Sequence, residues 1–225
     1  MNRLAPVPVE VVFLDVGGPI YGDRPFYEAL WRAISESRPF ASEADFWEEF
    51  ERARSEQSGP MTRRLISHFV EEEEARDEVL HRARGYWEYP PEVLQPDAAE
   101  TIAALAQSYR LGVIANQQPW IRETMRRDGL AERFEIWAVS AELGIDKPDP
   151  RIFEHALAEA GEPADRCAMV GDRLDNDVRP AKALGMKAVW LLRGEAPDDP
   201  TAEQLAVPDA TIRTLDELPA TLDRL

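Results

Sequence analysis

Apolar residues along this chain follow two patterns, one typical of buried strands and one typical of amphipathic helices. The first short apolar run covers residues 11–14 and is followed by Asp15 and the turn Gly17-Gly18. An unbroken apolar run bounded by turn residues is typical of a parallel strand that is buried on both faces. We therefore expect Asp15 at the carboxyl end of a strand, where ligands bind in open α/β sheets. An aspartate in this place can equally do no more than cap a turn.

From Pro25 to about Tyr89 the apolar residues recur at helical spacing, and no strand-like run interrupts them. We predict four helices here. Ser42 and Asp45 are candidate N-caps, and the Gly59-Pro60 pair separates two of the helices.

Beyond residue 97 the pattern changes to strands alternating with helices. The expected strands cover residues 110–116, 134–139, 167–172, 187–192 and 210–214, and the expected helices cover residues 97–109, 120–127, 149–160, 175–184 and 215–225. Such alternation predicts βαβ units and a parallel sheet.

The two patterns together predict an α/β fold, a Rossmann-like parallel sheet with helices on both faces and an inserted helical-bundle cap. We expect residues 1–20 and 97–225 to form the Rossmann-like core that carries catalysis, and residues 21–96 to form the inserted cap with its hinge connectors. Because the insert directly follows Asp15, it should lie above the carboxyl end of the sheet and open and close as a lid.

Charge and cysteine content narrow the range of partners. The 225 residues carry a formal net charge of −17, which repels nucleic acid and anionic membranes. The single cysteine, Cys167, lies in an apolar run, where it forms no internal disulfide and fits a reducing compartment. The first eight residues lack an apolar signal core, and no run reaches the length of a membrane span, so we expect a cytoplasmic protein.

Polar residues follow three other predicted strands, at the sheet edge where Asp15 is expected. Asp172 and Asp177 would bring further carboxylates to this edge, and oxygen-only ligands call for a hard cation such as Mg²⁺. Lys147, one of only three lysines in the chain, lies in a proline-stiffened loop and is a candidate for binding an anion. Asn116 ends the second strand, where a helix N-cap is the simpler role.

Four motifs in chain order carry a resemblance to a known family. They are F-L-D-V-G-G-P-I with Asp15, V-I-A-N with Asn116, K-P-D-P-R-I-F with Lys147, and V-G-D-R-L-D-N-D with Asp172 and Asp177. This pattern resembles the haloacid dehalogenase-like hydrolase superfamily, in the branch with a helical cap inserted after the first strand. The resemblance covers essentially the whole chain.

The resemblance implies an Mg²⁺-dependent phosphohydrolase that acts on a small phosphorylated metabolite. Asp15 would attack phosphorus and form an aspartyl-phosphate, and Lys147 would balance the negative charge of nucleophile and phosphate. Asp15, the backbone carbonyl of Gly17 and Asp172 would hold the metal, with Asp177 orienting water or Asp172. The positions expected to bind substrate are Asn116, Lys147 and Gly18.

Two positions depart from the family pattern. Gly17 stands where phosphatases of the family carry a second aspartate as general acid and base, and Ala115 stands where they carry a hydroxyl that donates to phosphate. A degenerate member that binds a phosphorylated ligand or partner with little or no turnover is therefore the alternative.

Two other reactions of the family fit the sequence less well. A dehalogenase needs no metal, and it does not typically keep the arrangement of Asp172 and Asp177. A phosphonatase uses a lysine of its cap, and residues 1–146 contain none.

Overall fold

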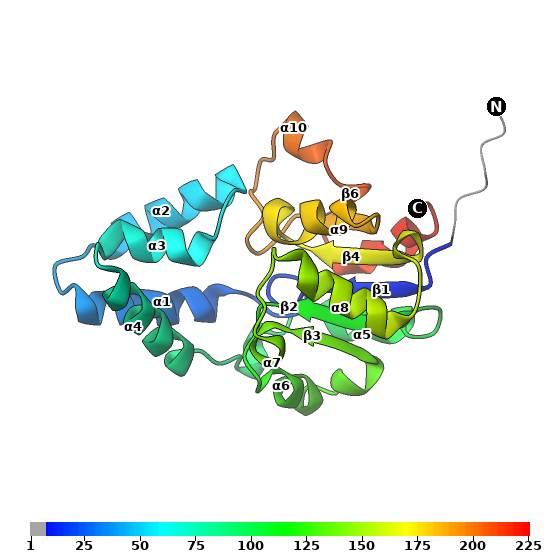
Figure 1. Cartoon of the computed structure of the whole chain (residues 1–225), viewed down its shortest axis with the longest axis horizontal. Coiled ribbons are helices and arrows are strands. Elements are labelled where there is room, and N and C mark those ends of the chain that lie inside the picture. Colours follow the sequence, from blue (N-terminus) through cyan, green and yellow to red (C-terminus); the bar gives the residue numbers. More distant parts are fainter. Residues whose placement is uncertain (1–7) are drawn as a thin grey trace.

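The computed structural model describes residues 8–225. Residues 1–7 lie outside the described residues, and they hold the start of the expected 1–20 core segment and most of the stretch without a signal core. A parallel sheet with its helices lies on one side of the molecule, and helices α1–α4 lie together on the other (Figure 1). No helix within the described residues is long and apolar enough to cross a membrane.

Six parallel strands form one sheet in the order β3-β2-β1-β4-β5-β6. The strands are β1 (Val11–Leu14), β2 (Arg110–Ala115), β3 (Ile136–Val139), β4 (Cys167–Gly171), β5 (Lys187–Leu191) and β6 (Ala210–Ile212). Strand β1 lies between β2 and β4, so that Val11 pairs with both Arg110 and Cys167. The strand order reverses direction between β1 and β4, and at such a switch point the loops leave a crevice at the carboxyl ends.

Helices cover both faces of the sheet, which confirms the predicted fold class. Successive residues of β1 point to opposite faces. Val12 and Leu14 pack in the core under helices α5 (Ala98–Leu105), α6 (Ile121–Arg127) and α11 (Leu218–Leu222). Val11 and Phe13 pack in the core under α8 (Pro150–Ala160) and α9 (Arg179–Ala183).

The insert after β1 consists of the four expected helices, α1 (Arg24–Ser37), α2 (Glu43–Glu56), α3 (Met61–Phe69) and α4 (Glu73–Tyr86). They bury a hydrophobic core of their own, which includes Leu30, Ile34, Phe46, Leu65 and Val79. We refer to α1–α4 as the helical cap; the division of the chain at residues 20–21 and 96–97 stays a prediction.

Ser42 is confirmed as the N-cap of α2, because its side chain accepts a hydrogen bond from the Asp45 backbone N–H. Asp45 lies inside that helix, so its assignment as an N-cap is wrong. Asp97, the first residue of the expected helix 97–109, stands before α5 but does not cap it with its side chain; the carboxylate instead pairs with Arg193 at 2.8 Å and accepts the Leu215 N–H at 2.6 Å.

The expected helix 175–184 begins as a π-helical turn, η4 (Leu174–Val178), before it continues as α9. Helices α7 (Ser140–Leu143) and α10 (Ala202–Leu205) were not expected, because four residues are too few to show a helical period. Single 3₁₀ turns complete the described structure at η1 (Pro91–Val93), η2 (Ala131–Arg133), η3 (Ala164–Arg166) and η5 (Leu215–Glu217).

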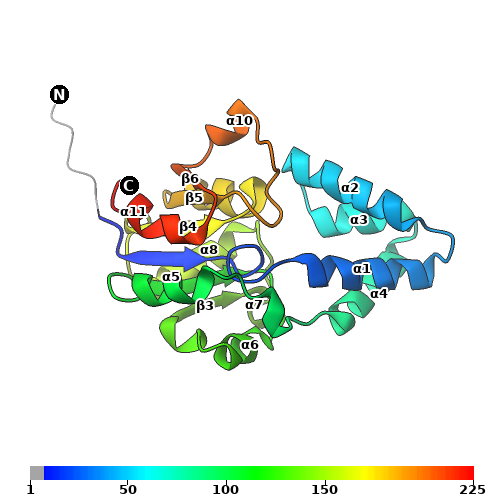
Figure 2. The same cartoon turned by 180° about the vertical axis from the view of Figure 1, so that it is seen from behind.

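The end of α2 contacts the core through the loop between β5 and α10, and both views show the two side by side (Figures 1 and 2). Gln57, which follows α2 with φ 50°, donates to the Glu195 carbonyl at 2.6 Å and accepts the Leu174 N–H at 2.9 Å. The Tyr27 hydroxyl of α1 donates to the Glu195 carboxylate at 2.7 Å. We call this set the Glu195 contact; it joins the helical cap to the core.

Candidate active site

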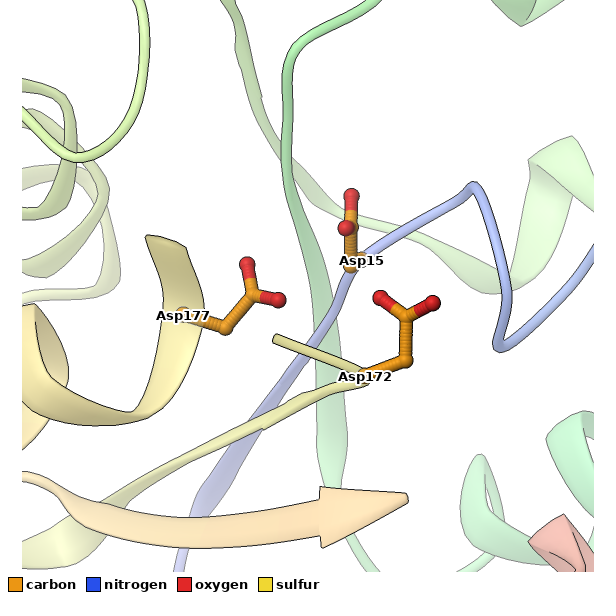
Figure 3. Close-up of side chains that lie close together, drawn as sticks. All are labelled: Asp15, Asp172 and Asp177. Carbon is orange, nitrogen blue, oxygen red and sulfur yellow. The ribbon is translucent and has the colours of Figure 1, made fainter. Parts of the chain in front are cut away.

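Three carboxylates converge where β1 and β4 end. Asp15 follows β1, Asp172 follows β4, and Asp177 lies on the π turn, and the side chains point toward one another (Figure 3). One oxygen from each lies within 4.8 Å of the others. The register of the sheet brings these residues together. The Asp15 N–H donates to the Val170 carbonyl of β4 at 2.9 Å, so β1 and β4 end side by side.

Lys147 reaches into the same cluster from the loop before α8. Its ammonium Nζ lies 2.9 Å from Asp15 Oδ1 and 2.6 Å from Asp177 Oδ1, and its side chain is 1% exposed. The Asn116 side chain positions this loop, since it donates to the Lys147 carbonyl at 3.0 Å and accepts the Lys147 N–H at 2.7 Å. Burial alone would lower the pKa of Lys147, but the carboxylates of Asp15 and Asp177 outweigh it and raise the pKa, so the ammonium stays charged.

Negative charge exceeds positive charge in this cluster. The pKa of Asp15 is raised to about 7, chiefly by burial, with a contribution from the Asp177 carboxylate and with Lys147 opposing the shift. Burial also raises the pKa of Asp172 well above its usual range, with the carboxylates of Asp23 and Glu195 adding to the effect. One lysine against several buried carboxylates leaves room for a divalent cation, and the donor set consists of hard oxygens. The residues therefore fit Mg²⁺.

Asp177 differs from the other two carboxylates because both of its oxygens are held by the protein. Lys147 binds Oδ1, and the Arg173 N–H donates to Oδ2 at 3.0 Å. This geometry suits the expected orienting role of Asp177 better than direct metal ligation.

Glycines make room for the carboxylate of Asp172. Gly18 has φ +77°, a conformation that L side chains rarely adopt, and a Cβ there would overlap the Asp172 carboxylate. A Cβ at Gly194 would overlap the same carboxylate from the opposite loop. The neighbouring Glu195 N–H donates to Asp172 Oδ2 at 2.6 Å and fixes its orientation.

A cavity of about 400 Å³ lies between this cluster and the helical cap. The expected site residues on its wall are Asp15, Gly17, Asn116, Lys147 and Asp172. Gly18 is not on the wall; its carbonyl accepts hydrogen bonds from Gln95 and Arg193 instead.

Three residues that line the cavity each have a buried polar atom without a hydrogen-bond partner. The atoms are Asp23 Oδ2, Trp87 Nε1 and Gln117 Oε1, and they are all the buried side-chain nitrogen and oxygen atoms without a partner in residues 8–225. Because a buried polar group without a partner destabilises the protein, water or a polar ligand in this cavity would be the source of partners for such atoms.

Sequence reasoning missed Asp23 and Glu195. Asp23 lies in the short polar connector before Pro25, where an aspartate is typical of a helix N-cap, and Glu195 lies in a loop rich in proline and aspartate. Neither stretch has a periodic pattern, so nothing in the sequence distinguishes these acids from surface residues.

Comparison with known proteins finds similarity to hydrolases, among them two phosphatases. The family model described as "haloacid dehalogenase-like hydrolase" matches residues 9–185. The chain is 37% identical over 170 residues to the phosphoserine phosphatase of Thermus thermophilus, a match that covers 72% of this chain and 65% of that protein. It is 35% identical over 127 residues to the glyceraldehyde 3-phosphate phosphatase of Methanocaldococcus jannaschii, covering 55% of this chain and 54% of that protein. The matches thus span less than two thirds of these relatives.

Solved structures show the same fold over nearly the whole chain. A structure described as a predicted phosphoglycolate phosphatase from Haemophilus somnus has a TM-score of 0.75 at 19% identity, covering 95% of this chain and 97% of that one. The magnesium-bound putative hydrolase YfnB from Bacillus subtilis has a TM-score of 0.71 at 20% identity, covering 96% of this chain and 100% of that one. With its family model matched from the first strand to the end of α9, this chain belongs to the haloacid dehalogenase-like hydrolase family.

Proposed function

We propose that this chain is an Mg²⁺-dependent phosphohydrolase that acts on a small phosphorylated metabolite through an aspartyl-phosphate at Asp15. The observation that carries the proposal is the buried cluster of Asp15, Lys147, Asp172 and Asp177, of which Asp15, Lys147 and Asp172 line the cavity under the helical cap. The names of the similar proteins, phosphoserine phosphatase and glyceraldehyde 3-phosphate phosphatase, support this class of substrate.

In this mechanism Asp15 is the nucleophile. Its carboxylate oxygen forms a bond to phosphorus while the bond from phosphorus to the leaving oxygen breaks, and water later cleaves the aspartyl-phosphate. Lys147, held against Asp15 by Asp177, compensates the charge that develops on the phosphoryl oxygens. Asp15, Asp172 and the Gly17 carbonyl would hold Mg²⁺, with Asp177 as the orienting acid; the ion would supply further neutralisation of the phosphate.

The position of the helical cap over the cluster supports a reaction that is shielded from bulk water. The Glu195 contact keeps α2 on the core, and the cavity wall includes Trp87 from the segment that returns to the core. Excluding bulk water strengthens the attraction between Lys147 and a bound phosphate. It also limits the attack of water on phosphorus before Asp15 has reacted.

A non-catalytic member that binds a phosphorylated ligand is the alternative. It is favoured by Gly17 and by Ala115, which is fully buried at the end of β2 and has no hydroxyl to offer.

The test is a screen of phosphorylated metabolites for release of inorganic phosphate, with Mg²⁺ and with EDTA. We expect release only with Mg²⁺, and none from Asp15→Asn, whose amide has nearly the same shape but is no nucleophile. Beryllium fluoride should form a phosphate mimic on Asp15 of the wild type. Binding of a phosphorylated compound without any release would favour the non-catalytic alternative, and full activity in Asp15→Asn would refute the role of Asp15.

A further inference from the structure

Asp23 occupies the position of a helix N-cap without acting as one. It directly precedes α1, yet its side chain makes no hydrogen bond to the first-turn N–H groups. Only its backbone carbonyl takes part in starting the helix, by accepting the Phe26 N–H at 3.0 Å. An aspartate at this position usually caps the helix with its side chain, so the presence of an aspartate at position 23 requires another explanation.

The carboxyl group of Asp23 fills the space beside Gly17 where a side chain would lie. A Cβ built on Gly17 would overlap Asp23 Oδ1, and it would lie 3.5 Å from the Tyr89 hydroxyl. Gly17 does not have a positive φ, so its backbone would accept a side chain and only the presence of Asp23 excludes one. Gly17, one of the two residues that depart from the family pattern, is thus the residue whose side-chain space Asp23 uses.

The other oxygen of Asp23 is available to a ligand. Oδ2 is buried, has no hydrogen-bond partner among the described residues, and belongs to a residue on the wall of the cavity that Asp15 and Lys147 also line. A carboxyl group on the wall of the cavity that Asp15 and Lys147 also line, with one oxygen that no described protein donor occupies, has the placement that proton transfer to a substrate requires.

We propose that Asp23 is the general acid and base of this enzyme, supplied by the start of the helical cap in place of a residue at position 17. The assignment rests on the proposed phosphohydrolase function and adds a catalytic residue to it.

The proposed reaction has two steps. As Asp15 attacks phosphorus and the ester P–O bond breaks, the Asp23 carboxylic acid gives its proton to the leaving oxygen, which departs as an alcohol. A water molecule then attacks the aspartyl-phosphate and gives a proton to the Asp23 carboxylate, while the bond from phosphorus to the Asp15 oxygen breaks. Phosphate leaves, and both aspartates return to their starting states.

The test compares leaving groups in Asp23→Asn, which keeps the shape of the side chain but is no acid. With an alkyl phosphate the first step should slow by about 10²–10⁴-fold, the usual contribution of a placed general acid. With p-nitrophenyl phosphate the first step should change by less than about tenfold, because that leaving group needs no proton. Since the second step also loses its base, rapid mixing should show a burst of about one equivalent of nitrophenolate per active site.

Glu28→Gln is the matched control, because it removes a carboxylate from α1, the helix that Asp23 precedes, and this carboxylate pairs with Arg24 at the surface. It should show wild-type rates on both esters and no burst. A second pair of variants moves the acid instead of deleting it: Asp23→Ala should lose alkyl phosphate turnover, and Gly17→Asp in the Asp23→Ala background should recover at least about tenfold.

The outcomes separate this assignment from the proposed function. Equal loss of the first step on both esters in Asp23→Asn, without a burst, would show a structural or metal-holding role and overturn the assignment alone. A folded double variant with no recovery would count against it in the same way. If the wild type releases phosphate from neither ester with Mg²⁺ present, the proposed function fails and the assignment fails with it.

Discussion

Replacing Lys147 with methionine tests the charge balance of the cluster. The substitution keeps a side chain of similar length but removes the cation that lies 2.9 Å from Asp15 and 2.6 Å from Asp177. Because the side chains of Lys147 and Asp177 are 1% and 0% exposed, bulk water does not replace the ammonium at Asp177.

The expected loss of stability follows from that burial. Removing one partner of a buried ion pair typically costs about 3–5 kcal/mol, because the remaining charge is left unpaired in a poor solvent. In a chain of this size about 1 kcal/mol corresponds to a shift of roughly 2–4 °C in Tm, so we expect Lys147→Met without metal to melt about 6–20 °C below the wild type. Mg²⁺ should restore more stability to this variant than to the wild type, since it neutralises the same carboxylates.

The assay is thermal unfolding followed by circular dichroism, with EDTA or with saturating Mg²⁺. Lys182→Met is the control, because Lys182 pairs with Asp209 at the surface, where its side chain is 34% exposed, and exposed pairs contribute only about 0–1 kcal/mol. If Lys147→Met melts no lower than Lys182→Met in EDTA, or gains no more from Mg²⁺ than the wild type does, the charge argument is refuted.

Three further outcomes are expected. Gly17→Asp alone should lose about 1–3 kcal/mol in urea unfolding, because its side chain overlaps Asp23, and Asp23→Ala should relieve that loss; equal instability in both backgrounds would contradict the overlap. Cys167 should not react with a thiol reagent at pH 8 in the native protein but should react in denaturant, because burial raises the pKa of its thiol to about 11; fast native labelling would disprove this. Gln57→Ala removes both hydrogen bonds that its side chain makes to the core, so amide hydrogen exchange should become faster throughout α2; unchanged exchange would show that the Glu195 contact does not hold the helical cap.

The parts of the fold with a regular pattern could be predicted from the sequence. Buried parallel strands require apolar runs, and the carboxyl ends of these runs place Asp15 and Asp172 together because β1 and β4 are neighbours. The role of Asp97 could not be predicted, because its partners Arg193 and Leu215 are about a hundred residues away and outweigh its local preference to cap a helix.

Asp23 shows why part of the site could not be predicted. Its importance depends on a complementarity with Gly17, in which one residue lacks a side chain and the other fills the space. Such a pairing has no periodicity and no fixed spacing, so the sequence alone offers no pattern that reveals it.

The Glu195 contact links substrate exchange to the state of the reacting groups. One residue accepts the Tyr27 hydroxyl of the helical cap through its carboxylate and holds Asp172 through its backbone N–H. Any displacement of α1 that stretches the hydrogen bond from Tyr27 would therefore pull on the same short loop that orients Asp172. In the proposed reaction, a movement of the helical cap away from the core would thus also disturb one of the carboxylates that would hold Mg²⁺.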